Sequence, residues 1–302
     1  MHSNGYERDI IIVTGCNAVG KTTASNYLRK LANLHKILFE NCIISDSQCL
    51  FEAMQLDDQA GGLHHTHDWC TTGTQDHSHL PDRPEFPFIV LDDELPNMMR
   101  QQFFLKLTEL PKTGKLWFVE WAAGINTNPP EDPVSCIDYS YSLVKRMVHD
   151  GTLPDGWLKR IKAAIHLEAD NHVRFELNKK RFVPSSARMH AIETGTAFWQ
   201  KDERVLRFYG RDDFSEIKGL FQAAGIPIYT LKNDGGNSFY KGLAKIAGAL
   251  FLPRLPLFFS GMVMYISNMF SLFGDHKSTS STEKPLIVKG TSPTEKQEKV
   301  SV

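Results

Sequence analysis

The sequence has almost no net charge. Its 302 residues include 34 lysines and arginines against 35 aspartates and glutamates, and the formal net charge at pH 7 is -1. Proteins that hold nucleic acid through its phosphates usually carry a basic excess, because each neutralised phosphate needs a cation. The composition therefore argues against a nucleic-acid partner, and we expect none.

Cysteine is scarce as well. The five cysteines are odd in number and unevenly spaced, at Cys16, Cys42, Cys49, Cys70 and Cys136. This arrangement argues against a disulfide framework and favours reduced thiols in a cytoplasmic compartment. The first nine residues, MHSNGYERD, lack the apolar segment of a secretory signal, so we expect a cytoplasmic protein.

Hydrophobic residues make up 41% of the chain, enough for one sizeable core with a lid or a small appended segment. Strand patterns alternate with helix patterns along most of the sequence. The strands are expected at 10–13, 35–46, 86–95, 115–122, 163–169 and 226–231, and the helices at 21–34, 47–55, 97–110, 139–148, 171–181, 213–225 and 239–250. Repeated βα units with right-handed crossovers predict an α/β fold with a doubly wound, mainly parallel sheet and helices on both faces.

The stretch DIIIVTGCNAVGKTT, residues 9–23, is the most informative part of the sequence. Three isoleucines and a valine without polar alternation suit a strand buried on both faces of a parallel sheet. Residues 15–22 then match the phosphate-binding pattern G-x-x-x-x-G-K-[ST]. The apolar spacing from Lys21 to Leu34 predicts an amphipathic helix whose positive end faces an anion.

In this pattern, backbone N–H groups surround a polyphosphate, the lysine contacts the β- and γ-phosphates, and the threonine hydroxyl binds magnesium. Lys21 is therefore the predicted catalytic cation, and Thr22 a predicted magnesium ligand. The predicted nucleotide-binding residues are Gly15, Cys16, Asn17, Ala18, Val19, Gly20, Lys21, Thr22 and Thr23.

Magnesium beside a phosphate loop also needs a carboxylate from the end of a neighbouring strand. Asp92 follows the apolar residues of FIVLDDE, with Asp93 or Glu94 as a candidate base, and Glu120 ends LWFVE. Both Asp92 and Glu120 stay open as the catalytic carboxylate that binds magnesium, because the choice depends on which strand lies beside the loop. Asp46, at the end of another expected strand, is a candidate general base towards the acceptor or, alternatively, a helix cap.

The segment AIHLEADNHVRFELNKKR, residues 164–181, resembles nucleoside and nucleotide kinases of the P-loop superfamily, especially the thymidylate-kinase-like and deoxynucleoside-kinase branches. The phosphate loop and IPIYTLKNDGG, residues 226–236, are similar to the same group. The resemblance implies a phosphate lid opened by Lys179, Lys180 and Arg181, with Arg181 contacting the nucleotide. It also implies arginines that clamp phosphates; the candidates are Arg188, Arg204, Arg207 and Arg211, of which Arg204 and Arg207 are assigned a catalytic role.

Two positions depart from those branches. Trp121 stands where an arginine typically follows the strand acid, and Leu177 stands where another arginine is common. These departures put the acceptor in question and leave phosphoryl transfer intact. Four aromatic residues, Trp117, Trp121, Tyr139 and Tyr141, are open to two interpretations, stacking on a substrate ring or packing in the core.

The expected kinase-like domain covers residues 1–250 and includes a histidine-rich insertion at 57–87 and a lid at 179–211. The insertion contains potential metal ligands, namely His64, His65, His67, Cys70, His77 and His79, with Asp68 and Asp76 nearby. Three interpretations stay open, a zinc site, an acceptor-binding insertion and a solvated polar loop.

The C-terminal part contains a long uncharged stretch. Residues 255–273, LPLFFSGMVMYISNMFSLF, fit the length of one bilayer crossing, or a hairpin that lies on a membrane or docks on a protein. We expect membrane attachment through the segment 251–274, ahead of burial against the domain, and a disordered tail at 275–302.

These observations predict an ATP- and Mg²⁺-dependent kinase that transfers a γ-phosphoryl group to a small acceptor, with a nucleoside or nucleotide as the expected acceptor. One alternative is an ATPase, consistent with LDDE, and another is a nucleotide-binding regulatory module without turnover. A GTPase is disfavoured, because no N-K-x-D base-reading sequence is present and NKKR, which begins at Asn178, ends in arginine.

Overall fold

The structure is a computed structural model of the chain, and it describes residues 8–66, 89–90, 92, 94–130, 137–181 and 206–252. The chain divides into two units, 1–256 and 257–302, and all the described residues belong to the first. The apolar stretch 255–273 and the tail 275–302 lie outside the described residues. Within the described ranges, no helix has the length and apolar character needed to cross a membrane.

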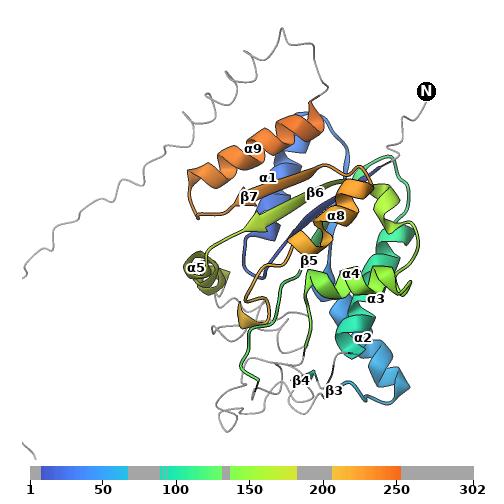
Figure 1. Ribbon diagram of the computed structural model, residues 1–302. Helices are drawn as coiled ribbons and strands as arrows, with labels where there is room; N and C mark the ends of the chain where they lie inside the picture. Colours follow the sequence, from blue (N-terminus) through green and yellow to red (C-terminus); the bar gives the residue numbers. More distant parts are fainter. Residues whose placement is uncertain are drawn as a thin grey trace, which may run out of the picture. The chain divides into compact units, whose positions relative to one another are not determined.

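A five-stranded parallel sheet forms the centre of the first unit (Figure 1). Its strands lie in the order β2, β5, β1, β6 and β7, and every neighbouring pair is parallel. Their bounds are β1 Ile10–Gly15, β2 Phe39–Ser45, β5 Leu116–Ala122, β6 Ile161–Glu168 and β7 Ile228–Lys232. The first strand of the chain is therefore the central one.

The central strand is buried on both faces. Ile10, Ile11, Ile12 and Val13 are all 0% exposed. Because successive side chains of a strand point to opposite faces, Ile10 and Ile12 pack in one hydrophobic cluster, and Ile11 and Val13 in another. Each such side chain contributes about 1.5–3 kcal/mol on burial, which explains why this apolar run takes the middle of the sheet.

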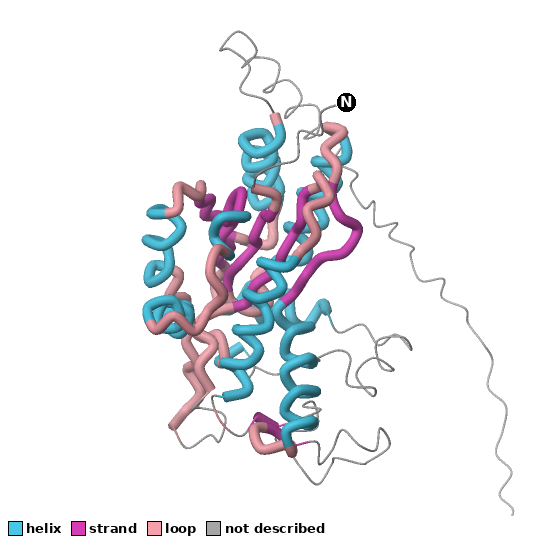
Figure 2. The backbone as a smooth tube through the Cα atoms, turned by 90° about the vertical axis from the view of Figure 1, so that its right-hand side faces the viewer, coloured by secondary structure: helices cyan, strands magenta, loops and turns pink. Residues whose placement is uncertain are grey.

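Helices cover both faces, as Figure 2 shows for the whole described unit. One cluster contains residues of α2 Asp46–Ala60, α3 Glu94–Glu109, α4 Tyr141–His149, the 3₁₀ turn η2 Trp157–Arg160 and α8 Ser215–Ala223. The other contains residues of α1 Lys21–Leu34 and α9 Asn237–Phe251. A further helix, α5 Asn171–Arg181, follows β6. The predicted doubly wound α/β fold is confirmed.

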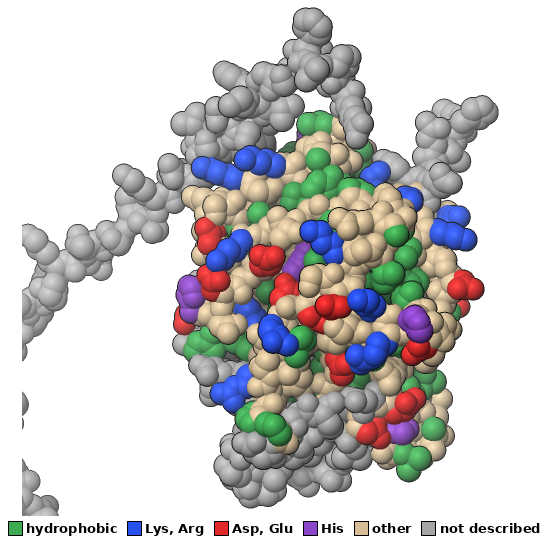
Figure 3. Space-filling model, in the orientation of Figure 1, with side chains coloured by type: hydrophobic (Ala, Val, Ile, Leu, Met, Phe, Trp, Pro, Cys, Tyr) green, Lys and Arg blue, Asp and Glu red, His purple; other side chains and the backbone are tan. Residues whose placement is uncertain are grey.

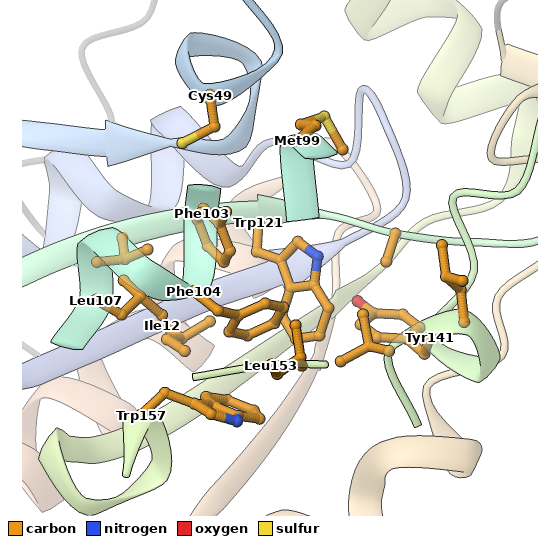
Figure 4. Packing of buried hydrophobic residues seen from close by; sticks show 14 of the residues in the cluster. Ile12, Cys49, Met99, Phe103, Phe104, Leu107, Trp121, Tyr141, Leu153 and Trp157 are labelled. Atoms are coloured by element: carbon orange, nitrogen blue, oxygen red, sulfur yellow. The ribbon is translucent and has the colours of Figure 1, made fainter. Parts of the chain in front are cut away.

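Aromatic rings fill the space between β5 and the helices on its side (Figure 4). Trp121 is fully buried, with the rings of Phe104 and Tyr141 at centroid distances of 5.4 and 5.0 Å. Trp117 and Tyr139 are each only 6% exposed. All four aromatic residues singled out in the sequence are therefore buried within the fold, so packing is the interpretation that their burial supports.

One expected strand takes a different place. Within the described part of 86–95, Ile89–Val90 form a strand, β4, which pairs antiparallel with β3, His65–Thr66, in a separate two-stranded sheet. The expectation that this segment adds a strand to the main sheet is wrong. An apolar run of four residues fits an edge pairing as well as a buried strand, and sequence periodicity does not separate the two.

Candidate phosphate-binding site

The loop between β1 and α1 requires glycine at both of its ends. Gly15 has φ +142°, and a Cβ added there would lie 2.3 Å from the Leu167 carbonyl oxygen. Gly20 has φ +94°, and its Cβ would lie 2.6 Å from Nδ2 of Asn233. Both conformations are strained for residues with a side chain. Glycine at these two positions therefore lets the loop pass close to β6 at one end and close to the turn after β7 at the other.

Lys21, the first residue of α1, folds back over this loop. Its side chain is buried, and Nζ donates hydrogen bonds to the carbonyl oxygens of Gly15 at 3.1 Å and Cys16 at 2.9 Å. The N-cap of α1, Gly20, has no side chain to cap the helix, and the first turn contains no acidic residue. The positive end of the helix dipole therefore faces the loop together with the lysine ammonium group, an arrangement suited to an anion.

Inside the loop, one amide already has a partner. The backbone N–H of Ala18 donates to Oδ1 of Asn17 at 2.8 Å, and Ala18 itself has φ +61°. Cys16 and Val19 are buried. Burial raises the pKa of Cys16 to about 11, so its side chain is a neutral thiol at pH 7.

Thr22 and Glu120 meet beside the loop. Strands β1 and β5 are hydrogen-bonded neighbours with Val13 opposite Glu120, so the glutamate lies at the same sheet edge as the loop. The hydroxyl of Thr22 donates to Oε2 of Glu120 at 2.7 Å. The other oxygen, Oε1, is buried and has no hydrogen-bond partner among the described residues. A carboxylate oxygen left in this way suits a hard cation such as Mg²⁺.

Asp92 lies elsewhere. It follows β4 of the small sheet, where Oδ2 is 2.9 Å from Nδ1 of His64 and Oδ1 accepts a hydrogen bond from the backbone N–H of Glu94. Burial alone would raise the pKa of Asp92, but these two hydrogen bonds hold it below its ordinary value. Of the two acids left open by the sequence, Glu120 lies in β5, the strand beside the phosphate loop, whereas Asp92 lies next to the small sheet.

Asp46 is buried at the start of α2. Its Oδ2 accepts a 2.6 Å hydrogen bond from the backbone N–H of Ala122, two residues beyond Glu120, and lies 3.6 Å from Nη1 of Arg100. Arg100 is 0% exposed and donates to the carbonyl oxygens of Ala122 and Tyr139. This buried pair connects α2 and α3 to the end of β5, where Glu120 projects.

Arg174 is a residue that the sequence interpretation missed. It is only 2% exposed, and its guanidinium group donates to the carbonyl oxygens of Asn17 and Leu206, both at 3.0 Å, and to Oδ1 of Asn171 at 3.1 Å. It thereby joins the phosphate loop, α5 and the segment that begins at Leu206. The sequence shows only that Arg174 lies one turn into the helix after β6, and this position does not reveal which groups the side chain contacts.

The predicted lid arginines are only partly described. Arg207 and Arg211 have exposed side chains, and their backbones pair with the chain after β5, through Thr127 and Ile125. Arg188 and Arg204 lie outside the described residues, and the side chains of Lys179, Lys180 and Arg181 are not described. Most of the histidine-rich insertion also lies outside the described residues, including His67, Cys70, His77 and His79.

The turn after β7 lies against the phosphate loop. Nδ2 of Asn233 donates to the carbonyl oxygen of Val19 at 2.9 Å, and Oδ1 accepts from the N–H of Gly235 at the same distance. The turn that follows β7 therefore borders the loop directly.

The sheet and the loop together define the class: a doubly wound α/β fold with a glycine loop of phosphate-binding sequence between its central strand and the helix that follows. No family model matches the sequence, and a comparison with curated proteins found no match. Among solved structures, 13% identity and a TM-score of 0.33 relate it to TT1252 from Thermus thermophilus, over 80% of this chain and 97% of that one. Shikimate kinase from Acinetobacter baumannii, in complex with shikimate, has 12% identity and a TM-score of 0.36, over 84% of this chain and 99% of that one. Similarity this distant assigns neither a family nor an activity.

Proposed function

We propose that this protein is an ATP- and Mg²⁺-dependent phosphotransferase that acts on a small acceptor. The observation that carries the proposal is the contact between the Thr22 hydroxyl and the Glu120 carboxylate, at 2.7 Å. A loop hydroxyl and a strand-end carboxylate are the two protein groups that hold magnesium beside nucleotide phosphates. When bound, Mg²⁺ supplies charge neutralisation at the phosphate oxygens.

The remaining groups of the loop bind and orient phosphate. Lys21, held by the Gly15 and Cys16 carbonyls, keeps an ammonium group where negative charge develops on a transferring phosphoryl group. Glycine at positions 15 and 20 lets the backbone turn its N–H groups inward. We assign Asp46 to positioning, because its carboxylate bonds the backbone of Ala122 and so fixes the end of β5.

The acceptor is proposed to be a nucleoside or nucleotide, on the basis of the resemblance at residues 164–181 and 226–236. The exposed guanidinium groups of Arg207 and Arg211 supply positive charge on a segment that Arg174 attaches to the loop. Arginine in this setting suits bidentate contact with phosphate oxygens. The same resemblance assigns phosphate contact to Arg181, Arg188 and Arg204.

The test is an acceptor screen with wild type, Lys21→Ala and Lys30→Ala. Product and ADP are measured after incubation with Mg-ATP and panels of nucleosides, nucleotides and small hydroxylated metabolites. We expect ADP formation that requires one class of acceptor, and a loss of roughly 10²–10³-fold in kcat for Lys21→Ala, as is typical when one group that stabilises transition-state charge is removed. Lys30 is exposed on α1, so Lys30→Ala is the matched control and keeps wild-type turnover.

Three outcomes would contradict the proposal. ATP hydrolysis that needs no acceptor indicates an ATPase, and tight ATP binding without any product indicates a regulatory module. If calorimetry detects no binding of ATP with Mg²⁺ to the folded wild-type protein, the phosphate-binding assignment itself fails.

A further inference from the structure

A second group of ligand-type side chains lies on the other side of the central strand. His166 and Glu168 are in β6, and Asp212 lies in the segment before α8. One potential ligand atom from each of the three residues lies within 4.8 Å of the others. Strand β6 flanks β1 on the side opposite β5, so this cluster is distinct from Thr22 and Glu120.

The histidine is the unusual member of the cluster. It is only 1% exposed, and neither Nδ1 nor Nε2 has a hydrogen-bond partner among the described residues, although Nε2 lies 2.7 Å from Oδ2 of Asp212. Its ring packs against Phe214 at a centroid distance of 4.1 Å and faces Tyr141 at 6.2 Å. Buried polar groups without partners are rare in folded proteins, because each loses its hydration without a hydrogen bond to replace it.

We propose that His166, Glu168 and Asp212 form a binding site for a divalent transition-metal cation, with Zn²⁺ as the best match. Imidazole nitrogen favours zinc, and three protein ligands with a fourth position for water make an open tetrahedral site. Two ligands that bind zinc at about 2.0–2.1 Å lie roughly 3.3 Å apart, so only a small rotation of Asp212 away from His166 is needed.

Two carboxylates face the buried imidazole within this cluster. Oδ2 of Asp212 lies 2.7 Å from Nε2 of His166, and Glu168 supplies the second carboxylate of the group. A cation bound among them would give the buried ring nitrogen a partner and would offset the like charges of the two acids.

Hydrogen bonds show which carboxylate oxygens near His166 are available to bind a cation. Oδ1 of Asp212 accepts from the N–H of Phe214 at 2.9 Å, which leaves Oδ2 facing the histidine. Asp213 accepts hydrogen bonds from Tyr141 and Ser142, so it is not available as a ligand. Glu168 is exposed and the Asp212 side chain is 33% exposed, so a cation can enter from solvent. Figure 3 shows acidic and basic side chains intermingled on the face formed by β7, β6 and α8.

The experiment measures Zn²⁺ binding to the full-length, chelator-treated protein by calorimetry in the absence of nucleotide. Its variants are Asp212→Asn and Glu168→Gln, with Asp155→Asn and Glu109→Gln as matched controls at exposed positions away from the cluster. We expect wild type and both controls to bind Zn²⁺ equally, and each cluster variant to lose one site or to bind it at least roughly tenfold more weakly. His166 is avoided because its replacement would disturb packing against Phe214.

Zinc held by histidines of residues 57–87 would remain in all five proteins, so a loss confined to the two cluster variants assigns the site. Circular dichroism checks that these variants keep the wild-type fold. If Asp212→Asn and Glu168→Gln bind Zn²⁺ with the stoichiometry and Kd of wild type, or if wild type binds none, the site does not exist. Neither result depends on ATP turnover, so the test is independent of the proposed function.

Discussion

At the scale of single residues, the site depends on which acid lies beside the loop. Two acids, Asp92 and Glu120, follow apolar runs of similar character in the sequence. Of the two, Glu120 lies in a strand that is hydrogen-bonded to β1, and its carboxylate contacts Thr22. Its unpartnered Oε1 makes it the more suitable metal ligand of the two.

Neutralising Glu120 and Asp92 in turn compares their effects on the Mg²⁺ dependence of turnover. Glu120→Gln keeps the side-chain shape but removes the negative charge, so we expect the Mg²⁺ concentration for half-maximal ATP turnover to rise at least tenfold and kcat to fall. Asp92→Asn removes the same charge at the small sheet, and we expect no change in Mg²⁺ dependence. Steady-state kinetics at varied Mg²⁺ measure both variants. If Asp92→Asn shows the larger effect, the assignment of Glu120 is wrong.

At the scale of elements, α5 stabilises the phosphate loop through one buried side chain. Arg174 spans from α5 to the Asn17 and Leu206 carbonyls, which belong to segments far apart in the sequence. Burial lowers the pKa of its guanidinium group, yet an arginine stays charged in proteins, so its charge must be matched by these acceptors. The conformation of the phosphate loop and the position of α5 are therefore coupled through Arg174.

Arg174→Met should lower the free energy of unfolding by about 2–4 kcal/mol, because it leaves buried carbonyl oxygens without donors. It should also weaken ATP binding, since the loop loses its connection to α5. Arg146→Met is the control: Arg146 is 59% exposed and forms a surface ion pair with Asp138, so we expect a change of at most about 1 kcal/mol. Urea denaturation and calorimetry provide the two measurements. Equal losses in the two variants would rule out a special role for Arg174.

At the scale of the whole molecule, burial of the sheet under helices changes the pKa of two cysteine thiols. Cys16 and Cys49 are buried on the two faces of the sheet, whereas Cys42 is exposed on the edge strand β2. Burial raises the pKa of Cys16 to about 11 and that of Cys49 to about 12, from an ordinary value of 9.0. The fold therefore favours the neutral thiol form.

The raised pKa values of the two buried thiols make the free energy of unfolding depend on pH in alkaline solution. Below pH 9 the thiols are neutral in both the folded and unfolded chains, and they add no pH dependence. Above pH 9 the unfolded chain loses these protons first, so the free energy of unfolding falls as pH rises towards 11, by roughly 2–3 kcal/mol for each thiol. Denaturation at pH 8 and pH 10.5 measures the drop, which we expect to be smaller in Cys49→Ala than in wild type and unchanged in Cys42→Ala. An identical drop in all three proteins would contradict the assigned burial.

Much of the fold was predictable from the sequence, because its signals are local. The run Ile10–Val13, the glycine pattern and the amphipathic spacing of α1 occur within 25 consecutive residues. The βα alternation likewise placed β5, β6, β7 and the helices between them. The misplaced element was β4, whose two residues pair outside the main sheet. Short apolar runs do not reveal their pairing partner, because that depends on tertiary contacts.

The local sequence is enough to predict a glycine loop between a buried strand and a helix, since glycine conformation, β-branched burial and helix polarity act over neighbouring residues. Only the tertiary structure decided that Glu120 rather than Asp92 meets Thr22, that Arg174 and Asn233 hold the loop, and that His166 faces Asp212. These contacts join residues more than 40 positions apart in the sequence. They exist because parallel strands bring their carboxyl ends to one edge of the sheet, and strand order is set by the packing of the whole core.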